Sequence, residues 1–330
     1  MKTKPICNLT TALALLTIPV GLHAQKHRPQ GDFITDTLMV HDPVMAYENG
    51  TYHIFSTGMG VQHATSSDLK TWTVNVKPAI SPIPGWAHDS VPGFREHVWA
   101  PDIIRYNDRW WMAYSCSTFG KNTSAIGLMS AKSLHPAEVW SDHGPIICSR
   151  EGRDNWNAID PNFIIDEKGA PWLTFGSFWD GIQLVPLDKT MHIAAGAKMK
   201  TIARRKIIDT MDNPVEAPFI FRHGGYYYLF VSWDYCCQGM KSTYKVAVGR
   251  SRSIEGPYLD SNGKDMAKCG GTILIEGDKK TFEAAGHCSV YSIGDKDFFL
   301  CHGYAMDLGG ASILICKKIN WSKDGWPILK

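Results

Sequence analysis

The sequence predicts an all-β protein, specifically a five-bladed β-propeller. A strand–turn–strand pattern recurs five times, with copies starting near residues 42, 101, 160, 217 and 287. This period of roughly 55–70 residues is comparable to one four-stranded propeller blade. Each copy joins an apolar run to an aromatic-rich run through a polar turn, and helical periodicity is scarce. In a propeller the innermost strand of each blade lines a central channel, so equivalent positions of the five copies face one another there.

The five copies begin with short polar motifs, and a proline follows in four of them. The third copy is the clearest, because its apolar run Asn162–Ile165 leads through the turn Asp166–Gly169 into Trp172–Phe175. The fifth copy is the weakest. The opening motifs are His41-Asp42-Pro43, Ala100-Pro101-Asp102, Asn157-Ala158-Ile159-Asp160-Pro161, Glu216-Ala217-Pro218 and Gly286-His287.

Other segments complete the blades. We expect a third strand at Gln62–Ser66, an outer strand at Ala125–Ala131, and a turn at Ser67–Trp72 that docks an indole between blades. The Pro- and Gly-rich segment 81–93 reads as a long loop, of the kind that is often functional. Residues 190–206 show no clear pattern and are interpreted as an irregular excursion. The segment Thr37–Val40 is a candidate for the strand that closes the ring.

The amino terminus resembles a secretory signal. Lys2 and Lys4 precede an apolar stretch from about Leu9 to Val20, and Ala24 is a candidate cleavage point. The apolar stretch is too short to span a membrane comfortably. We therefore predict a signal peptide at 1–24 and an exported protein, periplasmic or secreted, without a membrane span. Residues 25–330 are expected to form a single catalytic domain.

Composition excludes some partners. The 330 residues include 34 basic and 32 acidic side chains, a formal net charge of +2, and no basic tract. A nucleic-acid partner is therefore not expected. We expect a monomer. Eight cysteines follow the predicted signal, and an exported protein can oxidise some of them. Cys236-Cys237 could form a disulfide between neighbours, but the pairing of the others cannot be read from the sequence.

Four polar residues fall at matching places in the repeats: Asp42, Asp160, Glu216 and His287. Three carboxylates in one funnel suit glycoside hydrolysis, in which an ionised carboxylate deprotonates water and a protonated one donates to the leaving oxygen. A third acid nearby raises the pKa of the proton donor, because like charges disfavour ionisation. The repeat pattern supplies the groups but does not assign their roles.

Structural interpretations compete for single residues. An aspartate before a proline is common in turns, and a lone buried histidine is more often a hydrogen-bonded core residue than a metal ligand. Asp102 lies two residues past the repeated position and is expected to cap backbone groups. Four polar groups at matching repeat positions nevertheless favour chemistry more strongly than any one of them alone.

At these residues the sequence resembles glycoside hydrolase family 43, and within it the α-1,5-L-arabinanases. The resemblance spans nearly all of the chain after the predicted signal and keeps the order of the motifs. Cys288 departs from it, since a polar asparagine is more usual after the histidine. The matching motifs are His41-Asp42-Pro43, Trp99-Ala100-Pro101-Asp102-Ile103, Asn157–Pro161, Phe175–Ile182, Val215-Glu216-Ala217-Pro218, Gly286-His287, the run Ser232–Tyr258 and Asp324-Gly325-Trp326-Pro327.

The resemblance implies a five-bladed propeller that cleaves arabinan or arabino-oligosaccharides with inversion at the anomeric carbon. It implies that Asp42 is the general base, Glu216 the general acid and Asp160 the residue that tunes the acid. It also implies a metal ion near His287, usually calcium, held largely through waters. The side chains that would contact arabinose are Trp99, Phe119, Asn157, Ser177 and Trp179.

The mode of action stays open at this stage. Endo-acting hydrolysis needs a groove open at both ends, and we favour it. The alternatives are an exo-acting arabinanase, an α-L-arabinofuranosidase or a β-xylosidase on the same fold. A non-catalytic carbohydrate-binding propeller is the alternative from another class, although such a protein has no need of three carboxylates.

Overall fold

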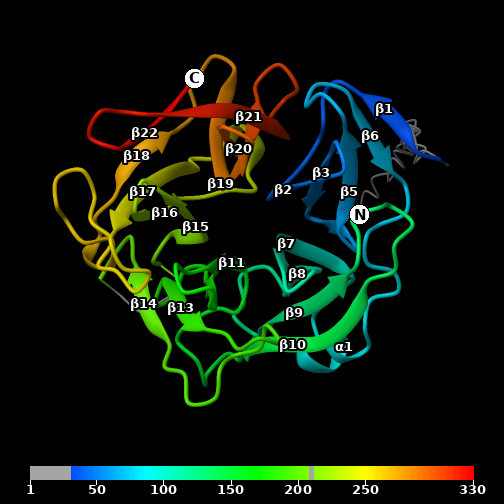
Figure 1. The fold of residues 1–330 in the computed structure, drawn as a ribbon, viewed down its shortest axis with the longest axis horizontal. Helices are drawn as coiled ribbons and strands as arrows, with labels where there is room; N and C mark the ends of the chain where they lie inside the picture. Colours follow the sequence, from blue (N-terminus) through cyan, green and yellow to red (C-terminus); the bar gives the residue numbers. More distant parts are fainter. Residues whose placement is uncertain (1–30, 208–211) are drawn as a thin grey trace, which may run out of the picture.

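The structure is a computed structural model, and it describes residues 31–207 and 212–330. The predicted signal peptide at 1–24 lies outside the described residues. Five antiparallel sheets stand side by side around a central axis (Figure 1). The predicted five-bladed β-propeller is confirmed. Among the helices of the described chain, none is long and apolar enough to cross a membrane.

The first two blades have five strands each. In blade one the order from rim to axis is β1-β6-β5-β3-β2; in blade two it is β10-β9-β8-β7, and the two-residue strand β4 pairs with the start of β7. The predicted strands at 62–66 and 125–131 are present as β5 and β9. The bounds are β1 Phe33–Thr35, β2 Val44–Glu48, β3 Thr51–Ser56, β4 Gly58–Met59, β5 Gln62–Ser66, β6 Trp72–Asn75, β7 His97–Tyr106, β8 Arg109–Cys116, β9 Ser124–Ala131 and β10 Ser141–Ser149, with the helix α1 at Trp86–Ser90.

The other three blades have four strands each, in sequence order from axis to rim. Two single-turn 3₁₀ helices, Gly239–Lys241 and Met266–Lys268, lie in loops of blade four. The bounds are β11 Asn162–Ile165, β12 Pro171–Phe175, β13 Ile182–Pro186, β14 Lys200–Ala203, β15 Val215–His223, β16 Tyr226–Trp233, β17 Lys245–Ser251, β18 Thr272–Ile275, β19 Phe282–Ile293, β20 Lys296–Ala305, β21 Ala311–Trp321 and β22 Pro327–Leu329.

Residues 190–206 were expected to form an irregular excursion, and this expectation was wrong for the last part of the segment. Lys200–Ala203 form β14, the outermost strand of blade three, paired with β13. An outermost strand is only partly covered, and here only Ile202 and Ala203 are buried. Two buried residues give too short an apolar pattern to be recognised in a sequence.

The segment Thr37–Val40, between β1 and β2, helps to close the ring, as predicted, although it is not a full strand. The Val40 N–H donates to the Ser312 carbonyl at 3.2 Å, and the Leu314 N–H donates to the Leu38 carbonyl at 2.9 Å. These bonds join the start of the described chain to β21 of blade five. Leu38 and Val40 are buried in a cluster that also contains Trp72, the indole predicted to dock between blades.

Every blade has one residue of left-handed backbone where its innermost strand begins or bulges. The φ angles lie between 41° and 57°. A bulge changes the direction of side chains and leaves one residue out of the strand's hydrogen-bond ladder. Proline has no N–H to donate, so a bulge can accommodate the proline that follows in four blades. The left-handed residues are Asp42, Ala100, Asp160, Ala217 and His287.

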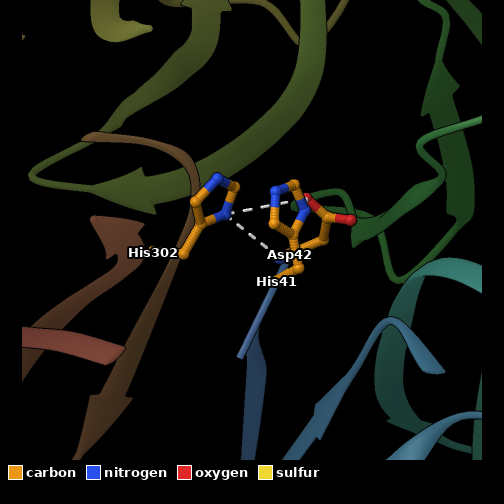
Figure 2. Close-up of side chains that lie close together, drawn as sticks. All are labelled: His41, Asp42 and His302. Carbon is orange, nitrogen blue, oxygen red and sulfur yellow. Dashed lines mark hydrogen bonds and ion pairs between the residues drawn. The ribbon is translucent and has the colours of Figure 1, made fainter. Parts of the chain in front are cut away.

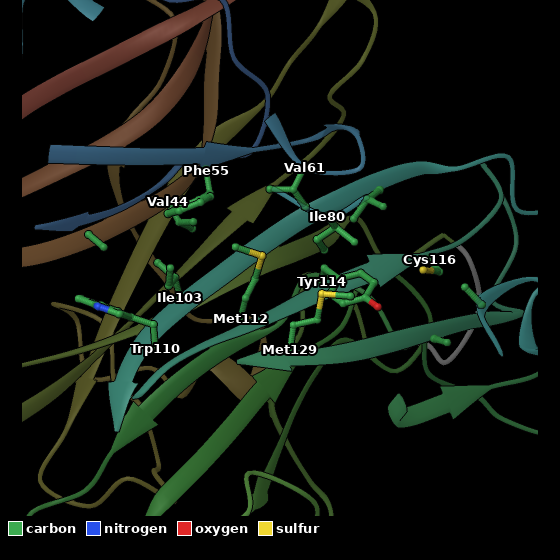
Figure 3. Packing of buried hydrophobic residues seen from close by; sticks show 14 of the residues in the cluster. Val44, Phe55, Val61, Ile80, Ile103, Trp110, Met112, Tyr114, Cys116 and Met129 are labelled. Carbon is green, nitrogen blue, oxygen red and sulfur yellow. The ribbon is translucent and has the colours of Figure 1, made fainter. Parts of the chain in front are cut away.

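Apolar side chains from facing sheets fill the space between neighbouring blades. The cluster between blades one and two includes Phe55, Val61, Met112 and Tyr114 (Figure 3), and similar clusters fill other blade interfaces. Each fully buried side chain of this size contributes about 1.5–3 kcal/mol to folding. Wedge-like packing of this kind fixes where the innermost strands point.

Asp102 ties blade two to blade three, in line with the structural role expected for it. Its Oδ2 accepts the Phe163 N–H at 2.7 Å and the Asn162 Nδ2–H at 3.3 Å. Burial raises the pKa of Asp102 to about 7, although these hydrogen bonds oppose the rise. The carboxyl therefore holds backbone in place rather than serving as a free acid.

A cavity of about 450 Å³ lies on the axis beside the middle and end of the innermost strands. Its walls are mostly apolar, with Met45, Ile103, Phe163, Phe219 and Val290 each supplied by a different blade. The left-handed residues sit at the opposite ends of the same strands. Because a sugar needs convergent polar groups, this cavity is not the carbohydrate site.

Two histidines form a buried pair in blade one. His53 Nδ1 lies 3.0 Å from His63 Nε2, and the His63 ring stacks on Phe55. Burial lowers the pKa of His53 to about 4, with nearby Glu48 opposing. Burial, with His53 and His135 nearby, lowers the pKa of His63 to about 3. Both rings are therefore neutral in the folded protein at neutral pH.

This pair predicts acid-sensitive folding. Below about pH 6.5 these histidines become protonated in the unfolded chain, whereas in the folded protein they stay neutral down to about pH 4 or lower. The free energy of unfolding is therefore highest above pH 6.5 and decreases as the pH falls. His53 alone accounts for roughly 3 kcal/mol over this range. Thermal melting from pH 7.5 to 4.5 should show the loss, and His63→Gln should flatten it. The exposed His88→Gln is the matched control; a pH dependence unchanged in His63→Gln would contradict the assignment.

Candidate active site

The structure brings the four predicted polar residues together at one end of the channel. Asp42, Asp160 and His287 occupy the left-handed positions of blades one, three and five. The predicted equivalence of Glu216 was off by one residue, because Ala217 is the left-handed residue of blade four and Glu216 precedes it. In blade two the same position is Ala100, which carries no polar group.

Asp42 is held by three side chains. Its Oδ1 lies 2.9 Å from His287 Nδ1 and 2.9 Å from His41 Nδ1, and its Oδ2 accepts the Thr57 hydroxyl at 2.5 Å. Burial alone would raise the pKa of Asp42, but His287 and His41 outweigh it and hold the pKa well below its usual range. Asp42 is therefore an ionised carboxylate at any ordinary pH, as a general base must be.

Glu216 accepts a hydroxyl on each oxygen. Ser177 donates to Oε2 at 2.8 Å, and Tyr244 donates to Oε1 at 2.7 Å. Burial raises the pKa of Glu216, with Asp42 adding to the rise, while the two hydroxyls and His287 oppose it. Tyr244 reaches this place because Gly286 has no side chain: a Cβ there would lie 2.1 Å from the tyrosine ring.

Asp160 is buried beside Glu216. Its Oδ2 accepts the N–H of Ala217, the residue after Glu216, at 3.1 Å. Burial raises the pKa of Asp160 to about 8, against the pull of His287 and with help from the charges of Glu216 and Asp42. Two neighbouring carboxyls that both resist ionisation retain a proton between them near neutral pH.

His287 carries the compensating charge. Burial would lower its pKa, but Asp42, Asp160 and Glu216 raise the pKa to about 9. At neutral pH the ring is therefore an imidazolium surrounded by three carboxyl groups. No protein partner for its Nε2 atom exists among the described residues.

A repeated hydrogen bond fixes the left-handed residues, and sequence reasoning missed it. In four blades the N–H of the left-handed residue donates to a side chain near the end of the second strand of the preceding blade, at 2.8–3.1 Å. Each acceptor lies fifteen positions after the left-handed residue of its own blade, which is a signal the sequence offers. The pairs are Ala100 with Thr57, Asp160 with Ser115, His287 with Ser232 and Asp42 with His302.

The exception to this repeat is at Glu216. In blade three the fifteen-residue spacing falls on Phe175, which offers no acceptor; Ser177, two residues later, donates to Glu216, and the Ala217 N–H donates to Asp160 instead. Blade four therefore gives up the common bond so that two carboxyls and a hydroxyl can meet. Departures from a repeat are expected where function imposes its own geometry.

The side chains predicted to contact sugar are not equally open. Phe119 is 77% exposed, and Trp99 and Trp179 are half-buried. Asn157 is buried and bonded within the protein, through Oδ1 to the Ser124 hydroxyl at 2.7 Å. Ser177 is also buried and donates to Glu216. Direct sugar contact remains a prediction for all five, with the exposed aromatic rings better placed for it.

A possible metal cluster lies beside the predicted one. His41, Asp42 and His302 bring three potential ligand atoms within 4.8 Å of one another (Figure 2). Calcium takes about six to eight oxygen ligands, and this trio offers one carboxylate and two imidazoles. Both histidines are already engaged, His41 with Asp42 and Tyr304, His302 with the Asp42 N–H. The donor set could hold a metal ion, but it does not fit calcium bound directly.

The arrangement suits acid–base hydrolysis of a glycosidic bond. One buried carboxylate is kept ionised by two histidines, while two neighbouring carboxyls are kept from ionising, within a single cluster. Groups whose environments drive their pKa values apart identify a base and an acid. Comparison with known proteins agrees with this chemistry: residues 37–327 match the family model described as "Glycosyl hydrolases family 43".

The chain belongs to glycosyl hydrolase family 43. It is 42% identical to the extracellular exo-α-(1→5)-L-arabinofuranosidase ArbA of Cellvibrio japonicus, over 87% of this chain and 85% of that one. It is 41% identical to the extracellular endo-α-(1→5)-L-arabinanase 1 of Bacillus subtilis, over 88% and 87%. A crystal structure of an exo-1,5-α-L-arabinanase from a bovine ruminal metagenomic library is 54% identical, with a TM-score of 0.86, covering 89% of this chain and 98% of that one.

Family membership confirms the resemblance drawn from the motifs and identifies the protein as a glycoside hydrolase of the arabinanase group. The alternative of a non-catalytic binding propeller loses its support. The relatives divide between endo- and exo-acting names, so membership leaves the mode of action open.

Proposed function

We propose that this protein hydrolyses the α-1,5 linkages of L-arabinan with inversion at the anomeric carbon. The observation that carries the proposal is the opposed ionisation within one buried cluster. The pKa of Asp42 is held low by His287 and His41, whereas burial raises the pKa values of Asp160 and Glu216. Such a division lets one site donate and accept protons at the same pH.

In this mechanism Asp42 removes a proton from water on one face of the sugar, and Glu216 protonates the leaving oxygen on the other. Inverting enzymes separate these two carboxyls by about 6.5–9.5 Å to admit the water. We assign the tuning role to Asp160, whose own pKa is raised by the neighbouring charge of Glu216, and Ser177 and Tyr244 orient the two oxygens of Glu216. Phe119 and Trp99 would stack on arabinose rings at the entrance.

We expect loss of activity when either role is removed. Asp42→Asn cannot accept the proton of water, and Glu216→Gln cannot protonate the leaving group, so each should lower kcat on linear arabinan on the order of 10²- to 10⁴-fold. Asp108→Asn, in the exposed β7–β8 turn, is the matched control and should keep full activity. Hydrolysis by either site variant at the rate of the unmutated protein would refute the roles.

The tuning role of Asp160 predicts a shifted pH profile. Asp160 and Glu216 share a proton near neutral pH, and a charge on either one opposes ionisation of the other, so Asp160→Asn should lower the pKa of Glu216. Activity that needs a protonated acid is lost as pH rises through that pKa, and the alkaline limb of kcat against pH should therefore move to lower pH. An alkaline limb that stays in place or moves upward would count against a tuning role.

We propose endo action as the primary mode. The loop 80–97, which could have walled off the groove, packs instead on blade two: Ala87, Val91 and Phe94 are buried there, and Trp86 Nε1 lies 3.2 Å from Asp142. The helix α1 within it lies at the outer edge of the ring (Figure 1). An exo-acting arabinanase is the second candidate, favoured by the 54% identity to an exo-acting relative.

Product analysis on linear arabinan separates the two modes. Endo action releases a mixture of oligosaccharides early in the reaction and lowers the viscosity of the polymer quickly. Release of a single short product from the first minutes, with slow loss of viscosity, would establish exo action. Debranched arabinan is the suitable substrate, because side branches would slow either mode.

A calcium ion near His287 remains part of the proposal, in a limited form. Only Nε2 of this residue is without a described protein partner, so a hard cation would be held through its own waters. Bound there, it would supply positive charge among the three carboxyl groups, in place of the imidazolium proton. The steps assigned to Asp42 and Glu216 do not depend on it.

The cation is testable by removal. Exhaustive chelation is expected to lower activity, calcium to restore it, and His287→Ala to be both weakly active and insensitive to added calcium. Elemental analysis of the purified protein gives an independent reading. Full activity after chelation, with no bound cation detected, would remove calcium from the account.

We also propose that the protein is exported. The support is the signal-like sequence at 1–24 and the extracellular names of the two curated relatives. An enzyme that acts on polymeric arabinan would meet this substrate outside the cytoplasm, in the periplasm or outside the cell. Amino-terminal sequencing of the protein purified from its source, beginning after Ala24, would agree with this.

A further inference from the structure

A disulfide joins Cys236 and Cys237, a pairing that the sequence had left open, and it lies close to the catalytic carboxylates. The Cys237 N–H donates to the Tyr304 hydroxyl oxygen at 2.7 Å. The Tyr304 oxygen lies 3.0 Å from His41 Nε2, and His41 Nδ1 lies 2.9 Å from Asp42 Oδ1. A continuous chain of hydrogen bonds therefore connects the disulfide to the proposed general base.

The direction of each bond in this chain can be worked out. The Asp42 N–H donates to His302 Nδ1 at 3.1 Å, so that nitrogen carries no proton. The neutral His302 ring then has its hydrogen on Nε2, which lies 3.3 Å from the Tyr304 oxygen. Tyr304 thus accepts from Cys237 and from His302, and the Ser242 side chain is a further hydrogen-bond partner of the same oxygen. Its own hydrogen is left for His41 Nε2.

This ordering selects one form of His41. A ring that accepts at Nε2 carries its hydrogen on Nδ1, and that hydrogen points at Asp42 Oδ1. The His41 ring is further held by stacking on His302, with 3.9 Å between ring centroids. Asp42 is therefore oriented by His41, and the tautomer of His41 is set by the hydrogen bond that its other nitrogen makes to Tyr304. A histidine in an acid–base site commonly has its tautomer fixed in this way.

The disulfide maintains the first link. Cys237 is exposed and has left-handed backbone, with φ at 64°, which a residue with a side chain rarely adopts. Its neighbours Tyr235, Gln238 and Met240 are also exposed, and the segment is held mainly by hydrogen bonds to Ser242 and Thr243. A covalent ring between adjacent side chains limits the conformations of the intervening peptide, whose N–H is the one that meets Tyr304.

We propose that the Cys236–Cys237 disulfide is a positioning element of the active site, acting through Tyr304 and His41 on Asp42. The inference rests on the proposed role of Asp42. None of these groups besides Asp42 needs to touch the substrate. Because Asp42 acts on water, breaking the disulfide should lower kcat and leave KM nearly unchanged.

The test compares kcat and KM on linear arabinan for the oxidised protein, the protein reduced with a phosphine, the double variant C236S/C237S and Tyr304→Phe. We expect kcat to fall on the order of tenfold in each of the last three, since small misplacement of a catalytic group has effects of this size. Reoxidation should restore the reduced sample. Cys269→Ser, a partly buried thiol elsewhere, should keep both constants and should respond to the reductant as the unmutated protein does.

Additivity decides whether the effect runs through Tyr304. Reducing the disulfide in Tyr304→Phe should cost little further, because the Tyr304 link is already absent and only the 3.9 Å contact between Cys237 Sγ and His41 Nε2 remains. Losses that multiply, an unchanged kcat on reduction, or a rise in KM accompanied by a fall in melting temperature would each overturn the proposal.

A second measurement, of the His41 tautomer, does not depend on hydrolysis. Nitrogen NMR of the histidines should show His41 with its hydrogen on Nδ1 in the oxidised protein and a mixture of tautomers after reduction. If arabinan is not a substrate, this result still decides whether the disulfide orders His41. An unchanged His41 tautomer after reduction would overturn the proposal, whatever the substrate proves to be.

Discussion

The ion pair between Asp42 and His287 is the contact on which the catalytic end of the channel depends. Three carboxyl groups are buried within reach of one another, and their mutual repulsion would force them to protonate or to separate. The imidazolium, 2.9 Å from Asp42, makes the burial tolerable and decides which carboxyl keeps its charge. Removing one partner of such a pair typically costs about 3–5 kcal/mol, because the other charge is left buried alone.

The backbone delivers these groups by a repeated device. In each blade one left-handed residue turns the innermost strand, and in four blades its N–H is fixed by the blade before. The scaffold bond and the catalytic side chain thus belong to the same residue at Asp42, Asp160 and His287. Where chemistry required a second carboxyl, at Glu216, the scaffold bond was given up. Stability and function are therefore adjusted at the same few positions.

Much of this could be read from the sequence, because five copies of one pattern reinforce one another. The fold, the order of the blades and the approach of Asp42, Asp160, Glu216 and His287 all follow from the repeat. The offset of Glu216 did not, since a left-handed residue leaves no mark in composition. The strand β14 was missed because only two of its residues are buried.

The partners of the carboxylates were harder to foresee. His302 and Tyr304 come from β20 and Tyr244 from the residue just before β17, and their roles depend on register and on close approaches such as that of Tyr244 to Gly286. A sequence shows which residues recur but not which distant side chains fill the space between them. The fifteen-residue spacing of the backbone acceptors is a signal that could have revealed His302, had the repeat been aligned on the left-handed residue.

The bond from the Asp42 N–H to His302 has a consequence for biosynthesis. Asp42 leaves the ribosome before His287, His302 and Tyr304, which follow only after blades two, three and four have been made. Until then the first blade holds a carboxylate whose partners do not yet exist. The first blade therefore cannot reach its final state before blade five is made, and the hydrolytic centre is completed only when blade five closes against blade one.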